Sequence, residues 1–107
     1  MTVLRRSRSR ARGEPEAYVL RLYVTGSTPR SALAIRNLKA ICDEHLKGRY
    51  VLEVIDVYQR PKLARDEQIV ATPTLIKALP TPLRRIIGDL SNVDRVLMGL
   101  DLKRKKA

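Results

Sequence analysis

Apolar residues gather in short runs along this chain, separated by glycine, proline and charged positions. Residues 18–25 (YVLRLYVT) are mostly β-branched and aromatic with one charge, Arg21, and this pattern predicts a strand. Thr28 and Pro29 then suit the cap and the first position of a helix that continues to about Leu46. The apolar face of this helix has three- and four-residue spacing and consists of Ala34, Leu38, Ile41, Cys42 and His45.

A second apolar run covers residues 50–58 (YVLEVIDVY) and is interrupted only by Glu53 and Asp56. A strand that is apolar on both faces predicts an interior position in a sheet covered on both sides. Short connections between strand, helix and strand predict a right-handed unit whose two strands are parallel. Pro61 then opens a short helix that we predict over residues 61–68.

Three prolines punctuate the next stretch, residues 71–90, at positions 73, 80 and 82. Because proline donates no ladder hydrogen bond, it belongs at strand starts, edges and turns. The stretch therefore predicts two short strands, residues 74–79 and 83–87, and their brief connection makes them antiparallel. A peptide bond at the start of a buried strand can be cis before proline, and sequence alone leaves the isomer at Pro73 open.

Ser91 is the predicted cap of a final helix over residues 92–102. Its predicted buried face consists of Val93, Val96, Leu97 and Leu100. The whole order is then strand, helix, strand, a short helix, two strands and a last helix. This order, βαβ-α-ββα, predicts a thioredoxin-like α/β fold.

The 107 residues suffice for one domain, and charge divides the chain into three parts. We expect a basic disordered arm at residues 1–17, a folded domain at residues 18–102 and a basic tail at residues 103–107. Of the formal charge of +11, the arm holds +3 and the tail +4. Basic tails attract any polyanion, so nucleic-acid binding through them is an alternative function beside simple solubilisation.

The residue set offers little for enzymatic or metal chemistry. Disulfide exchange in this fold needs a thiolate where the first strand meets the first helix, but residues 26–29 read GSTP, and the lone Cys42 is predicted in the core. Ser27 and Thr28 could bind an anion or a glutathione-like thiol there, although capping alone explains them. We therefore expect no enzyme, no catalytic residue, no metal and no cofactor. No signal peptide and no run of roughly 18 apolar residues is present, so we predict a cytoplasmic location.

Lys77, Arg84 and Arg85 form the most suggestive charge cluster outside the two ends of the chain. Strand alternation predicts that Lys77 and one of the arginines lie on a solvent face beside the prolines. Two interpretations stay open. The cluster is either an ordinary solvated face or a docking patch for an acidic partner, since the planar guanidinium group suits carboxylates.

Four long motifs between residues 18 and 102 carry a family resemblance. They are YVLRLYVTGSTP, KGRYVLEVIDV, IVATPTLIKALPTPLRRIIGDLSN and VLMGLDL. With these motifs the chain resembles the KaiB family of circadian-clock proteins. The resemblance implies a non-enzymatic regulator that binds a KaiC-type ATPase and modulates its phosphorylation or ATPase cycle. A KaiA-like protein and a KaiB-like sensor kinase are the further partners that it implies.

The same resemblance implies a protein that switches between two folds. One is thioredoxin-like and binds KaiC. The other, βαββααβ, rearranges the C-terminal half and assembles as a homo-oligomer, a dimer or a tetramer. By matching position, Pro73, Gly99 and Asp101 fall in the segments associated with the switch.

Lys77, Arg84 and Arg85 match basic positions that the family has near its partner surface. Glu53 departs from a lysine that is common in cyanobacterial members, and the basic tail replaces an acidic one. These departures, together with the arginine-rich arm, predict a divergent or non-cyanobacterial member of the family.

Overall fold

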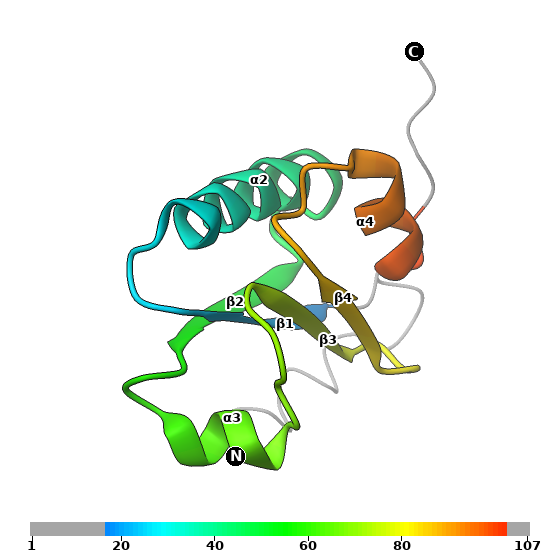
Figure 1. The fold of residues 1–107 in the computed structure, drawn as a ribbon. Coiled ribbons are helices and arrows are strands. Elements are labelled where there is room, and N and C mark those ends of the chain that lie inside the picture. Colours follow the sequence, from blue (N-terminus) through cyan, green and yellow to red (C-terminus); the bar gives the residue numbers. More distant parts are fainter. Residues whose placement is uncertain (1–16, 103–107) are drawn as a thin grey trace.

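The computed structural model describes residues 17–102, and this part of the chain contains seven helices and strands (Figure 1). In chain order they are β1 (Tyr18–Val24), α2 (Pro29–His45), β2 (Tyr50–Asp56), α3 (Pro61–Asp66), β3 (Thr74–Leu79), β4 (Arg84–Ile87) and α4 (Val93–Gly99). The predicted thioredoxin-like order is confirmed. The predicted tail and nearly all of the predicted arm lie outside the described residues.

The four strands form one mixed sheet in the order β2-β1-β3-β4. β1 and β2 are parallel, with their pairing running from Tyr18↔Tyr50 to Val24↔Asp56, which confirms the predicted strand–helix–strand unit. β3 is antiparallel to both β1 and β4, which confirms the predicted antiparallel pair. Helices α2 and α4 lie on one face of the sheet and α3 lies on the other (Figure 1).

Two apolar clusters hold the helices on the sheet. The larger cluster joins β1 to α2 and α4, and it contains the fully buried Cys42, as predicted. The smaller cluster lies under α3 and consists of Tyr23, Ile55, Ala64 and Ile76. Each face of the sheet is therefore anchored separately.

Local chemistry accounts for the start of α2. Thr28 is the N-cap, and its hydroxyl accepts a hydrogen bond from the Ser31 N–H at 3.3 Å. Pro29 opens the helix, where its missing N–H leaves no hydrogen bond unmade. The predicted cap and start are confirmed, and the helix ends at His45, one residue earlier than predicted.

The predicted interior position of the strand in residues 50–58 is wrong. β2 lies at an edge of the sheet, and Val51 and Val54 are 52% and 42% exposed. Leu52 nevertheless packs against the larger cluster and Ile55 against the smaller one. Both faces of an edge strand are thus apolar here, and an apolar run alone cannot distinguish this case from an interior strand.

The last helix differs from the prediction in its cap, in one buried residue and in its end, which lies at Gly99 rather than at residue 102. Asn92 caps α4 in place of Ser91, because its side-chain oxygen accepts a hydrogen bond from the Arg95 N–H at 3.1 Å. Val93 is 39% exposed rather than buried. It opens the helix, so its side chain, which points toward the N-terminus, has no helical turn beneath it. The other predicted residues are buried, namely Val96, Leu97 and Leu100.

The proline-rich stretch forms β3 and β4 where two strands were predicted, with β4 starting one residue later than expected. Its three X-Pro bonds are cis, at Thr72-Pro73, Leu79-Pro80 and Thr81-Pro82. No helix within residues 17–102 is long and apolar enough to cross a membrane.

Candidate partner-binding surface at β4 and α4

The candidate surface lies at the edge of the sheet where β4 meets the neighbouring helix α4 (Figure 1). A groove of about 270 Å³ lies between them. Its described lining consists of Arg84, Arg85, Ile86, Arg95, Met98 and Gly99, which we call the β4–α4 surface. Three of these six residues are arginines and none is acidic, and Met98 is 74% exposed. The surface is therefore cationic and partly apolar.

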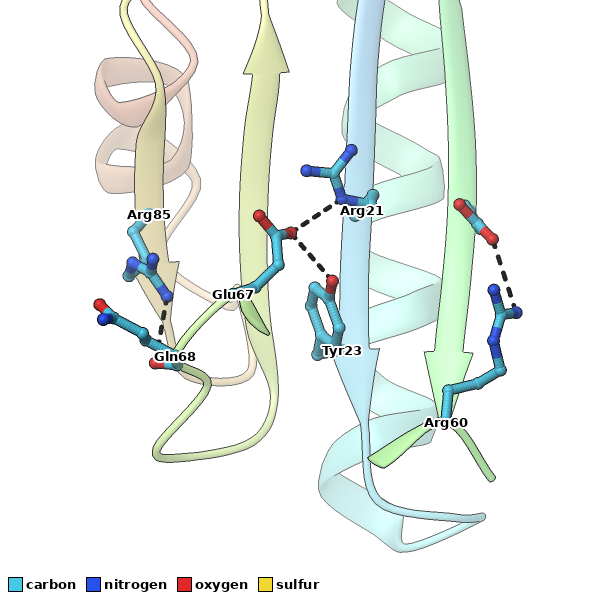
Figure 2. A network of polar contacts seen from close by, with 7 residues as sticks. Arg21, Tyr23, Arg60, Glu67, Gln68 and Arg85 are labelled. Atoms are coloured by element: carbon cyan, nitrogen blue, oxygen red, sulfur yellow. Dashed lines mark hydrogen bonds and ion pairs between the residues drawn. The ribbon is translucent and has the colours of Figure 1, made fainter. Parts of the chain in front are cut away.

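Arg84 and Arg85 are consecutive in β4, so their side chains project to opposite faces of the sheet. On the α4 side, Nη2 of Arg84 lies 3.2 Å from Oδ1 of Asp101. On the α3 side, Nη1 of Arg85 donates a hydrogen bond to the C=O of Gln68 at 3.4 Å (Figure 2). This edge strand thus presents positive charge on both faces.

Lys77 lies deeper than predicted. The prediction that it faces solvent is wrong, because its side chain is 1% exposed. Lys77 pairs with Arg84 across β3 and β4, so both side chains face the α4 side of the sheet. The segment that follows α4 closes over this face, and strand alternation carries no information about such a cover. Of the three predicted partner-binding residues, only Arg84 and Arg85 are exposed.

Asp101 joins the two cations on this face. One carboxylate oxygen accepts a hydrogen bond from the Lys77 ammonium at 2.5 Å, and the other accepts one from Arg84. These two hydrogen bonds hold the pKa of Asp101 below its usual value. Burial of an ammonium group requires a partner of this kind, so Asp101 compensates the charge of Lys77.

The three residues associated with a fold switch flank β4 at its two ends. Pro73 precedes β3, and its C=O accepts a hydrogen bond from the Gly88 N–H at 2.9 Å, directly after β4. Gly99 ends α4 against β4, where a Cβ would overlap the side chain of Ile86. Asp101 follows with its contacts to the sheet. Their role in a switch stays a prediction.

A second polar cluster lies on the sheet face that carries α3 (Figure 2). Oε1 of Glu67 accepts hydrogen bonds from Nε of Arg21 and from the Tyr23 hydroxyl, both at 2.9 Å. The hydrogen bond from Arg21 lowers the pKa of Glu67. Burial, with a further contribution from the Glu67 carboxylate, raises the pKa of Tyr23 to about 12. The cluster ties the end of α3 to β1.

This second cluster was not predicted from the sequence. Arg21 and Tyr23 stand two positions apart in one strand, which places them on the same face and is a readable signal. Glu67 comes from a different part of the chain, and its local sequence contains nothing that connects it with β1. The polar groups of the cluster hydrogen-bond to one another, so we interpret the cluster as a structural contact that holds α3 on the sheet.

Residues 17–102 give little support for metal binding or thiolate chemistry. In this part of the chain no three side chains of His, Cys, Asp or Glu lie close enough to hold a metal ion. Burial raises the pKa of the Cys42 thiol to about 12, so this residue does not supply a thiolate. The Thr28 hydroxyl donates to Oγ of Ser31 at 2.9 Å in addition to capping α2.

Comparisons with known proteins agree with this description. The model of the KaiB domain matches residues 21–102. The chain is 56% identical to the circadian clock oscillator protein KaiB of Thermostichus vulcanus over 87 residues, which is 81% of each chain. It is 55% identical to the protein of the same name from Microcystis aeruginosa, over 81% of this chain and 84% of that one.

Solved structures show the fold. The N-terminal domain of Synechococcus elongatus SasA matches with a TM-score of 0.68 and 21% identity, over 90% of this chain and 94% of that one. Mitochondrial thioredoxin 3 of Saccharomyces cerevisiae matches with a TM-score of 0.66 and 16% identity, over 92% and 90%. The thioredoxin-like fold predicted from the element order is thereby confirmed. Since both the family model and these relatives cover most of the chain, the protein belongs to the KaiB family.

Proposed function

We propose that this protein binds a KaiC-type ATPase and through this contact modulates the phosphorylation or ATPase cycle of that partner. Its relatives carry the name circadian clock oscillator protein, which supports a regulatory role in a clock. Membership of their family also makes the chain a non-enzymatic regulator, in agreement with the sequence-based expectation. The proposal places the protein in the cytoplasm, where an ATP-driven partner works.

The observation that carries this proposal is the chemistry of the β4–α4 surface. Arg95 is exposed at the groove, Arg85 is exposed on the opposite face of β4, and no carboxylate stands in the described lining of the groove. Arginine at a surface of this kind suits the carboxylates of a partner. Arg84 contributes charge at the same edge while holding Asp101. Lys77 is buried, so its proposed role is to position Asp101 and Arg84 rather than to contact the partner.

The proposal includes a fold switch and a homo-oligomer. In the second state the C-terminal half would leave the sheet arrangement described above and take the βαββααβ order in a dimer or tetramer. Support comes from the placement of Pro73, Gly99 and Asp101 at both ends of β4, where a rearrangement of this half would begin. A KaiA-like protein and a KaiB-like sensor kinase are the proposed further partners of the thioredoxin-like state.

The test is size-exclusion chromatography with light scattering, on the protein alone and after long incubation with the KaiC-type ATPase of its own organism under ATP and under ADP. We expect a dimer or tetramer alone and a slowly formed complex with the ATPase. A chain that forms no complex under either nucleotide contradicts the proposal.

Charge reversal locates the contact. The double variant Arg85→Glu and Arg95→Glu should weaken the complex by about tenfold or more, because it replaces attraction with repulsion on both faces of the β4 edge. The matched control is Arg36→Glu and Lys39→Glu, which makes the same charge change at two exposed positions of α2. Equal loss of binding in both double variants would show that net charge, and not the β4–α4 surface, attracts the partner.

A further inference from the structure

The backbone of β4 has a free side. β4 is the last strand in the order β2-β1-β3-β4, so within the described residues its outer edge faces no other strand. The Gly88 N–H donates to the C=O of Pro73, which makes these two residues a hydrogen-bonded pair of the antiparallel ladder. From this pair we can assign, for every residue of β4, whether its backbone N–H and C=O point toward β3 or away from the sheet.

The alternation identifies the outward-facing groups. The ladder between β3 and β4 continues with the pairs Thr74↔Ile87, Leu75↔Ile86, Ile76↔Arg85 and Lys77↔Arg84. Hydrogen-bonded and non-bonded pairs alternate in an antiparallel ladder, so Ile86 directs its N–H and C=O toward β3. Arg85 and Ile87 direct theirs away from the sheet. Unpaired groups of this kind form a template on which another extended segment can add as a strand.

The side chains around this free edge select the segment. Ile87 and Leu83 are each about half exposed and offer apolar contacts. Arg84 and Arg85 place positive charge on both faces of the strand, and Arg95 adds charge from α4. A second copy of the same edge is disfavoured, because pairing it with itself would bring these arginines side by side. The other free edge, β2, carries Glu53 and Asp56, so an acidic segment is directed to β4.

We propose that β4 takes up an extended acidic segment of the partner ATPase as a fifth strand of the sheet. This inference rests on the proposed function and adds the mode of recognition. Main-chain hydrogen bonds to Arg85 and Ile87 hold the segment, and its carboxylates lie beside Arg84 and Arg95 on one face and Arg85 on the other. Apolar side chains of the segment pack on Ile87 and Met98.

A backbone substitution tests the strand pairing. Ile87→Pro removes one outward N–H and leaves the inward ladder of Ile86 untouched, and proline is tolerated at strand edges. Ile87→Val is the matched control, since it keeps the N–H. We expect the proline variant to bind the ATPase about tenfold more weakly or worse, and the valine variant to bind like the unmodified chain. Retained amide protection of Ile86 verifies that the proline variant is folded, and equal binding of the two variants overturns the inference.

A peptide probe separates this inference from the proposed function. The probe is a capped nine-residue peptide with the repeat Val-Glu-Glu, which places glutamates on both faces of an extended strand, and the control peptide has lysine in place of glutamate. With the glutamate peptide, amide hydrogen exchange measured by NMR should slow by about tenfold at Arg85 and Ile87, and stay unchanged at Ile86, which is already paired. No protection at β4, or protection by the lysine peptide as well, overturns the inference. If the ATPase itself forms no complex with the unmodified chain, the proposed function fails, while the peptide result still decides what the β4 edge binds.

Discussion

Glu67 shows at the scale of single residues how one side chain can connect distant parts of this chain. Its carboxylate holds Arg21 and Tyr23 of β1 from the end of α3 (Figure 2). The side chains of Arg21 and Glu67 are mostly buried, at 26% and 19% exposure, so solvent screens this ion pair only in part. Glu53 and Arg60 on the same face are more than half exposed and 3.8 Å apart. The two pairs allow a direct comparison.

Glu67→Gln should lower the free energy of unfolding by about 1 kcal/mol, because the two hydrogen bonds lose the carboxylate charge. Tyr23→Phe should cost about 1 kcal/mol as well, and the double variant less than the sum, because both changes remove the same contact. Urea unfolding measures all three. Glu53→Gln is the matched control and should change stability by less than about 0.5 kcal/mol. Additive effects, or an equal loss in the control, would mean that the Glu67 cluster does not couple α3 to β1.

Helix α4 shows at the scale of elements how one short segment serves two purposes. Leu97 faces inward and is almost fully buried in the larger cluster, while the next residue, Met98, is largely exposed in the β4–α4 surface. Neighbouring positions on a helix differ by about 100° in direction, which accounts for this contrast. Stability and partner binding should therefore be separable within α4.

The comparison of Leu97→Ala with Met98→Ala tests this separation. We expect Leu97→Ala to lower the free energy of unfolding by about 2–4 kcal/mol, because it removes buried methyl groups and leaves a cavity. Met98→Ala should change it by less than about 0.5 kcal/mol and weaken the complex with the ATPase several-fold. Urea unfolding and affinity measurements check the two effects. A stable Met98→Ala variant with unchanged affinity would remove Met98 from the proposed contact.

At the scale of the whole molecule, the order of helices and strands is the same in both proposed folds for the N-terminal half of the domain and differs for the C-terminal half. β1, α2 and β2 begin both orders, βαβ-α-ββα and βαββααβ, whereas the segments after residue 60 follow different orders. The described part of the C-terminal half joins the sheet through β3 and the contacts at both ends of β4. Nucleic-acid binding through the basic ends stays a prediction, because residues 1–16 and 103–107 lie outside the described part.

Backbone NMR chemical shifts test the division. Secondary structure in residues 18–56 should be the same in the free oligomer and in the ATPase complex, and residues 61–69 and 84–100 should change between helix and strand. The same chemical shifts are measured for the Ile87→Val variant as a control. This variant keeps every backbone N–H group, so we expect the same change as in the unmodified chain. Identical secondary structure in both states would contradict the fold switch and leave the binding proposal standing.

The order of elements follows from the sequence, because caps, proline positions and apolar spacing act through neighbouring residues. Thr28 with Pro29, the spacing of α2 and the two proline-bounded strands are all correct on this basis. Burial and pairing depend on residues that are far apart. Lys77 is buried through Asp101, which stands 24 positions away, and Arg21 meets Glu67 across 46 positions. The edge position of β2 likewise depends on where β3 pairs, and no local pattern carries that information.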